Sequence, residues 1–166
     1  MYRFLLPLCA LLYGLSAYAA QPRLDAASLT AVDRATLEAT LNGNILQLEP
    51  HLAASFRANI QVPTDRGEQS LQLGRNEFLL YAWQVLAAAE DYSVRAQPAR
   101  YQIAADGHSA VGTRIFSEHV RWNGQPLRYT TERTTHYRPV DGTIRITQLQ
   151  VRILDWEVPE GGPEAR

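Results

Sequence analysis

Three arginines, Arg114, Arg133 and Arg152, are the residues of this chain whose type and spacing could do chemistry. A guanidinium donates hydrogen bonds in a planar fork that matches the two oxygens of a carboxylate or a phosphate. The turns described below place all three on one face of a predicted sheet, where like charges repel one another. Either these arginines bind an anionic ligand, or acidic side chains pair with them, or they reach solvent.

Four further polar residues share this predicted face and complete the candidate ligand-binding set. The one carboxylate among them is either a general base or the ion-pair partner of a neighbouring arginine, and we favour the ion pair. The others could orient the rest of a ligand through hydrogen bonds. The four are Glu118, Tyr129, Gln148 and Gln150.

The chain carries no pattern for a metal, a cofactor or an activated nucleophile. Its four histidines fall in different predicted elements, without His-x-His or His-Glu-x-x-His spacing. Gly-x-Ser-x-Gly and Gly-rich phosphate loops do not occur in it either. With 16 basic and 17 acidic residues, the charge argues against nucleic acid or an anionic membrane as the main partner. We expect no metal, no cofactor and no nucleic-acid partner.

Three two-residue turns, Asp106-Gly107, Asn123-Gly124 and Asp141-Gly142, fix the pairing of the second half of the chain. Asn-Gly and Asp-Gly supply the two positive-φ positions of a type I′ hairpin. Counting outward from the turns predicts strands at 92–104, 109–122, 126–140 and 143–158, with Pro98 interrupting the first. The predicted cross-strand pairs include Arg114 with Arg133, Glu118 with Tyr129, Arg133 with Gln150, and Thr131 with Arg152.

The opposite face of this predicted sheet carries more apolar residues than a solvated face needs. Either a second subunit covers it, or a bulge near Thr147 shifts the phase of the last strand. We predict a homodimer through this outer face. The residues concerned are Val111, Ile115, Leu149, Val151 and Ile153.

Apolar residues at helical spacing predict helices ahead of this sheet. The first runs from an N-cap at Ser28 to Leu41, and the longest, a central helix, covers 75–91. Shorter helical pieces are expected at 45–49 and 51–55, and strands at 56–62 and 70–73. Helices that cover the bulky face of an antiparallel sheet give an α+β fold.

The beginning of the sequence has the features of an export signal. A basic start, an apolar run from Phe4 to Leu15 and the sequence Ala17-Tyr18-Ala19 predict cleavage after Ala19. The run is shorter than the ~20 residues that span a bilayer, and the single cysteine, Cys9, leaves with it. We predict a signal peptide (1–19), a leader (20–27), one domain (28–158) and a polar tail (159–166), in a periplasmic or secreted protein without membrane insertion.

This order of elements resembles the NTF2-like, or SnoaL-like, domains of the cystatin-like fold. The motifs that carry the resemblance are Leu41–Asn44 followed by Leu48–Leu52, Gly74–Phe78, Ala105–Val111, and Arg133–Thr135 followed by Asp141-Gly142. The resemblance covers about residues 28–157. It implies a strongly curved sheet around a cone-shaped cavity, in which the family's enzymes hold an Asp or His general base.

The chain departs from the family's pattern where those enzymes commonly carry a Trp, a His and a Ser after the last turn. The matching positions are Ile144, Gln148 and Gln150, and glutamine cannot exchange a proton near neutral pH. We therefore favour an exported, non-catalytic domain whose cone binds a small, anionic and partly apolar ligand. Two alternatives stay open: an enzyme of isomerase, dehydratase or cyclase type with Glu118 as base, and a protein-interaction module acting as an adaptor or inhibitor.

Overall fold

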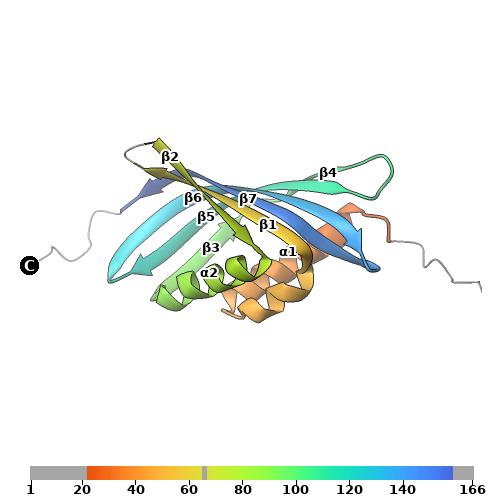
Figure 1. The fold of residues 1–166 in the computed structure, drawn as a ribbon. Coiled ribbons are helices and arrows are strands. Elements are labelled where there is room, and N and C mark those ends of the chain that lie inside the picture. Colours follow the sequence, from red (N-terminus) through yellow and green to blue (C-terminus); the bar gives the residue numbers. More distant parts are fainter. Residues whose placement is uncertain (1–21, 65–66, 159–166) are drawn as a thin grey trace, which may run out of the picture.

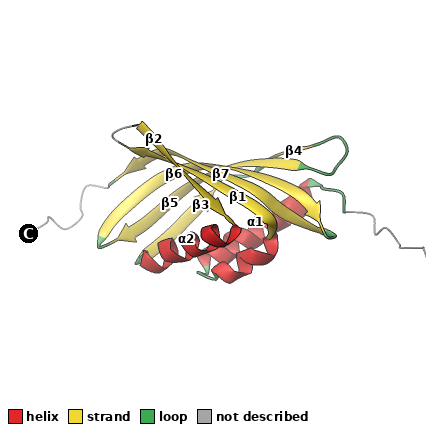
Figure 2. Cartoon of the chain, in the orientation of Figure 1, coloured by secondary structure: helices red, strands yellow, loops and turns green. Residues whose placement is uncertain are grey.

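The computed structural model describes residues 22–64 and 67–158, so the predicted signal peptide (1–19) and polar tail (159–166) lie outside the described residues. Two α-helices and a short 3-10 helix lie against one side of a large sheet (Figures 1 and 2). None of the helices within the described ranges is long and apolar enough to cross a membrane. The elements are α1 (Ala26–Leu41), η1 (Ile45–His51), β1 (Leu52–Thr64), β2 (Gly67–Gly74), α2 (Arg75–Ala88), β3 (Asp91–Ala96), β4 (Arg100–Ile103), β5 (Ala110–Trp122), β6 (Gln125–Val140) and β7 (Thr143–Glu157).

The strands form a seven-stranded sheet in the order β2-β1-β7-β6-β5-β3, with β4 also paired to β5. Figure 1 shows the long strands arching over α1 and α2, so the sheet has a concave side that the helices cover and a convex side that faces away from them. The predicted α+β class is confirmed. The sheet is antiparallel except that β1 runs parallel to β7, a pairing that the hairpin turns could not predict because it joins distant parts of the chain.

Two of the three turns have the predicted conformation. Asn123 and Asp141 each have a φ of 50°, and the glycine after each has a φ of 75°, as a type I′ turn requires. The register between β5 and β6 is confirmed along its length, with Arg114 opposite Arg133 and Glu118 opposite Tyr129. Asp106-Gly107 lies instead in a longer loop, in which the Ala104 N–H donates to the Ser109 carbonyl at 2.9 Å.

The predicted register of β7 is wrong beyond its first few residues. Tyr137 pairs with Ile146 as predicted, but His136 pairs with Gln148, which leaves Thr147 as an extra residue in β7. The Thr147 hydroxyl donates to the carbonyl of His136 at 3.3 Å and spans this bulge. Because side chains alternate along a strand, one extra residue moves all that follow it to the other face.

The bulge removes most of the surface on which the homodimer was predicted. Leu149, Val151 and Ile153 turn to the concave side, where they line a cavity. Only Val111 and Ile115 of the predicted outer apolar face remain, and both are partly exposed. The alternative that the sequence left open, a bulge near Thr147, therefore explains the apolar residues of β7 that were assigned to the outer face.

Several predicted element boundaries also change. Asp25 caps α1 in place of Ser28, since the Asp25 carboxylate accepts a hydrogen bond from the Ser28 N–H at 2.7 Å and lowers its own pKa by doing so. The predicted helical piece at 51–55 is wrong, because β1 begins at Leu52. Helix α2 ends at Ala88, which leaves Asp91 to start β3.

The hydrophobic core lies between α1 and the end of the sheet where β1, β6 and β7 meet. Leu29 and Phe56 are fully buried there, and Tyr137 is nearly so. A second, smaller cluster joins α1 to η1 and α2 through Ala39, Ile45 and Leu48. Both clusters stop short of the middle of the concave side, where the helices and the sheet enclose open space.

Candidate functional site

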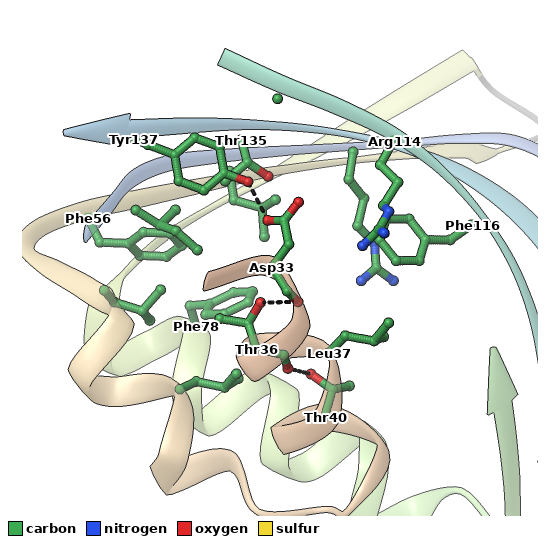
Figure 3. Close-up of a pocket in the computed structure, with 16 residues that line it drawn as sticks. Asp33, Thr36, Leu37, Thr40, Phe56, Phe78, Arg114, Phe116, Thr135 and Tyr137 are labelled. Carbon is green, nitrogen blue, oxygen red and sulfur yellow. Dashed lines mark hydrogen bonds between the residues drawn. The ribbon is translucent and has the colours of Figure 1, made fainter. Parts of the chain in front are cut away.

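A cavity of about 110 Å³ lies between α1 and the concave side of the sheet (Figure 3). Most of its wall is apolar and comes from α1, η1 and α2 and from strands β1, β5, β6 and β7. Charged groups enter it from two directions: Arg114 and Arg133 from the sheet, and Asp33 from α1. The apolar lining includes Leu37, Leu48, Leu52, Phe56, Phe78, Phe116 and Leu149.

Arg114 lies at the edge of this cavity with its terminal nitrogens free within the described part of the chain. Its Nε donates to the carbonyl of Gln97 at 2.7 Å, and its guanidinium lies 5.7 Å from the centroid of the Phe116 ring. Gln97 can accept this bond because the chain leaves the sheet between β3 and β4 at Pro98, as the sequence predicted. No carboxylate lies within 4.0 Å of Arg114 among the ion pairs of the described residues.

Arg133, directly opposite Arg114, is neutralised by Glu118. Its Nη2 lies 2.6 Å from Oε1 of Glu118, and its guanidinium stacks 4.2 Å from the centroid of the Phe116 ring. Burial, the largest single effect, lowers the pKa of Arg133, but the charge and hydrogen bond of Glu118 together with Tyr92 and Tyr129 raise it overall. Two opposed arginines are thus tolerated because one has an anion and both lie beside the same ring.

Both carboxylate oxygens of Glu118 are fully occupied by hydrogen-bond donors, and one donor is Arg133, in agreement with the ion pair that the sequence favoured. Its side chain is 3% exposed. Thr131 donates to Oε1 at 3.0 Å, while Tyr92 and Tyr129 donate to Oε2 at 2.6 and 3.4 Å. Burial, followed by the Glu118 charge, raises the pKa of both tyrosines, so they stay protonated donors. A carboxylate held by four donors has little freedom to take a proton from a substrate.

The other three predicted site residues lie on the convex side of the sheet. Beyond the Thr147 bulge, Gln148, Gln150 and Arg152 pair with His136, Thr134 and Glu132, whose side chains point away from the helices. Arg152 donates to Glu132 at 3.0 Å with 54% of its side chain exposed. The structure therefore brings together Arg114, Arg133, Glu118 and Tyr129, and separates them from the rest of the predicted set.

Asp33 is a residue of the cavity that the sequence prediction missed. Its two carboxylate oxygens accept hydrogen bonds from Tyr101, at 2.6 Å, and from Tyr137. Figure 3 shows it near the middle of the cavity, with Arg114 on the opposite wall. The available signal was its spacing, since it follows the fully buried Leu29 by four residues and so lies on the inward face of α1.

Gly112 makes room for the two tyrosines that hold Asp33. A Cβ atom at this position would lie 3.0 Å from the ring of Tyr101 and 3.1 Å from the ring of Tyr137. Without it the rings meet edge to face, with centroids 6.3 Å apart. Burial, followed by the hydrogen bond to Asp33, raises the pKa of Tyr101 to about 12.

A second, larger cavity of about 250 Å³ lies between α2 and the far half of the concave side. Most of its polar groups belong to the Glu118 network, Thr40 and Tyr81 are the other polar residues that line it, and the remaining wall is apolar. Trp122 and Trp156 are 39% and 57% exposed and are not among its lining residues, so tryptophans do not fill the cone. The apolar wall consists mainly of Ile60, Val62, Ala82, Val85, Leu86, Leu149, Val151 and Ile153.

The described residues hold no group of three or more His, Cys, Asp or Glu side chains that could bind a metal ion. The chemistry that the cavities offer is therefore hydrogen bonding and charge. One free guanidinium and one carboxylate face the smaller cavity, and apolar contact dominates both.

A scan against protein-family models finds no match to this chain, and a search of curated proteins finds none either. Solved structures are similar in fold. A hexachlorocyclohexane dehydrochlorinase, LinA type 3, from Novosphingobium barchaimii has a TM-score of 0.67 at 13% identity, covering 81% of this chain and 90% of its own. A protein proposed to be a dehydratase of the NTF2-like family, from Streptomyces avermitilis, has a TM-score of 0.62 at 14% identity, covering 78% and 95%.

An NTF2-like protein from Cytophaga hutchinsonii is similar to the same extent, with a TM-score of 0.62 at 12% identity over 79% of this chain and 100% of its own. Sequence identities this low show a similar fold and do not show a shared activity. The chain has the cone-shaped, cystatin-like fold of NTF2-like domains, as the sequence motifs implied.

Proposed function

We propose that the cone binds a small, partly apolar monocarboxylate and that Arg114 holds its carboxylate. The observation that carries this proposal is the state of Arg114. Its terminal nitrogens face the smaller cavity without a partner in the described part of the chain, whereas Glu118 already neutralises Arg133. A guanidinium in an apolar wall gains most from an anionic acceptor with two oxygens.

Asp33 limits the charge that such a ligand carries. Its carboxylate faces the same cavity, so a second negative charge on the ligand would be repelled in a site of low dielectric. One anionic group toward Arg114 and an apolar remainder toward Leu37, Phe56 and Phe78 fit both walls. We therefore propose a monoanion in place of a phosphate ester or a dicarboxylate.

The hydrogen bonds that the cavity carboxylates accept favour binding without catalysis. Glu118 is buried behind four donors, and each oxygen of Asp33 accepts a hydrogen bond from a tyrosine. Each oxygen of Glu118 accepts two hydrogen bonds, so Glu118 must release a donor before it can accept a substrate proton. Each oxygen of Asp33 accepts one hydrogen bond and keeps one lone pair.

An enzyme with Asp33 as its base is the second candidate. It is favoured by the position of Asp33, which faces Arg114 across the cavity. Asp33 could take a proton from a substrate while Arg114 stabilises the oxyanion that forms. Similar folds include a dehydrochlorinase and a proposed dehydratase. Deuterium uptake beside the ketone of 4-oxopentanoate in D2O, measured by NMR, would support this candidate if Asp33→Asn abolishes it.

Thermal unfolding with butanoate, compared with butanamide at equal ionic strength, tests the binding proposal. Butanoate should raise the melting temperature of the wild type and of Arg152→Gln, whose arginine lies on the convex side. It should leave Arg114→Gln unchanged. An equal response of all three proteins, or a response to butanamide as large as that to butanoate, would contradict the role of Arg114.

We also propose that the protein acts in the periplasm or outside the cell, on the support of its first 19 residues. Mass spectrometry of the protein from its native host should show a chain that begins at Ala20. Recovery of the uncleaved chain from the cytoplasm would overturn this proposal.

A further inference from the structure

The two cavities adjoin one another and share part of their walls. Five residues line both: Thr40, Leu48, Phe78, Arg133 and Leu149. Phe78 and Leu149 come from α2 and β7, which cover the space from opposite sides. A molecule bound in the smaller cavity therefore lies next to the larger one, on the same concave side of the sheet.

The larger cavity offers a ligand almost only apolar contact. Most of its polar groups hydrogen bond to Glu118, to which Tyr92, Tyr129, Thr131 and Arg133 all donate. Thr40 and Tyr81 also line it, and the Thr40 hydroxyl donates to the Thr36 carbonyl at 2.9 Å. The three hydroxyls that donate to Glu118 and Nη2 of Arg133 are engaged, while Nε of Arg133 is buried without a hydrogen-bond partner among the described residues. A polar ligand group placed there would regain little of the hydration that it loses. Side chains from β1, α2 and β7 supply most of the rest of the wall, with one each from α1 and η1.

The apolar wall also continues beyond this cavity toward the end of the sheet. Trp156 pairs with Tyr129, so both side chains project to the concave side, and Trp156 is 57% exposed. A second bulge, at Leu154, brings Trp156 into this register. A tryptophan left in solvent at the end of an apolar wall provides further contact area for an extended chain.

From this arrangement we infer that the ligand is an elongated amphiphile. Its carboxylate head lies at Arg114 in the smaller cavity, and its apolar chain passes Phe78 and Arg133 into the larger cavity between α2 and β7. This inference rests on the proposed function and adds the chain and the place where it lies. Short carboxylates would occupy only the head site.

Calorimetric titration with butanoate, hexanoate and octanoate tests the position of the chain. Burial of one methylene tightens binding about fourfold, as its transfer free energy predicts, so the affinity should rise steadily through this series. Ala82→Trp fills the larger cavity from α2 and should lower the affinity for octanoate to that for butanoate. Gln84→Trp, at an exposed position on the same helix, is the matched control and should behave as the wild type.

The outcomes separate the two proposals. If butanoate binds in an Arg114-dependent way but octanoate binds no more tightly, the elongated ligand is wrong and the proposed function stands. If the gain with length survives in Ala82→Trp, and also in Val85→Phe as a smaller filling of the same cavity, the chain lies elsewhere and the inference is wrong. If none of the three carboxylates binds, or if Arg114→Gln binds them as tightly as the wild type does, the proposed function itself fails.

Discussion

The Oε1 atom of Glu118 lies 2.6 Å from Nη2 of Arg133, across the pairing of β5 with β6 and beside both cavities. This contact pairs the two charged side chains at the border between the cavities. Within the described part of the chain it leaves Arg114 as the cation of the smaller cavity that has no anionic partner. It also engages Nη2 of Arg133, which lines both cavities. The two cavities consequently differ in chemistry although they share a wall.

Replacing Glu118 by Gln should destabilise the fold strongly. It leaves the Arg133 charge, with 25% of its side chain exposed, without an anion, and loss of one partner from a buried pair costs about 3 kcal/mol. Glu132, which precedes Arg133 in β6, forms an exposed pair with Arg152. Glu132→Gln breaks that pair and should lower the free energy of unfolding by less than about 1 kcal/mol. Urea unfolding of the two variants measures this difference, and equal losses would show that the Glu118 pair does not stabilise the fold.

Because of the bulge at Thr147, substitutions at two adjacent positions of β7 should differ strongly in their effect on the free energy of unfolding. Val151 lines the larger cavity, so Val151→Asp should lower the free energy of unfolding by about 2 kcal/mol through burial of a charge. Gln150 is exposed on the convex side, and Gln150→Asp should change stability by less than about 0.5 kcal/mol. The reverse order would mean that β7 keeps the unshifted register.

His51 should make the stability depend on pH below its usual pKa. Burial, followed by the nearby Arg145 charge, lowers its pKa in the folded state from 6.5. The unfolded chain then binds the proton first, so this stability is fully present above pH 6.5 and is lost as the pH falls toward the folded pKa. His51→Gln should lose less stability than the wild type over that range, and parallel curves from denaturant titrations at several pH values would contradict the shift.

Tyr101 reports on the hydrogen bond to Asp33. Its pKa of about 12 means that the stability it contributes is present below its usual value of 10.0 and is lost as the pH rises from there toward 12. Asp33→Asn should lower the pKa of Tyr101, but not to 10.0, because burial is the larger cause. Carbon-13 NMR of the tyrosine rings, assigned with Tyr101→Phe, gives this value, and an unchanged pKa would rule out the hydrogen bond.

The part of the sheet next to a tight turn could be predicted from the sequence. Asn123-Gly124 determines the pairing of β5 with β6, which is why Arg114 opposite Arg133 was predicted correctly. The phase of β7 could not be derived in this way, since neither Gly nor Pro marks the bulge at Thr147. The apolar residues at alternate positions after it favoured a bulge as much as a dimer.

The composition of the site was predicted only in part for a related reason. Arg114, Arg133, Glu118 and Tyr129 lie on two strands joined by one turn, so local register brings them together. Asp33 meets Tyr101 and Tyr137 through the packing of α1 on the sheet, and no turn in the sequence determines how a helix is placed.

The most direct measurement is a crystal structure of the protein with 8-bromooctanoate, in which anomalous scattering locates the bromine. We expect the carboxylate within hydrogen-bonding distance of the terminal nitrogens of Arg114. We expect the bromine in the larger cavity, near Ala82, Val85 and Val151. A carboxylate bound on the convex side near Arg152, or a cone without bound ligand in crystals soaked to saturation, would contradict it.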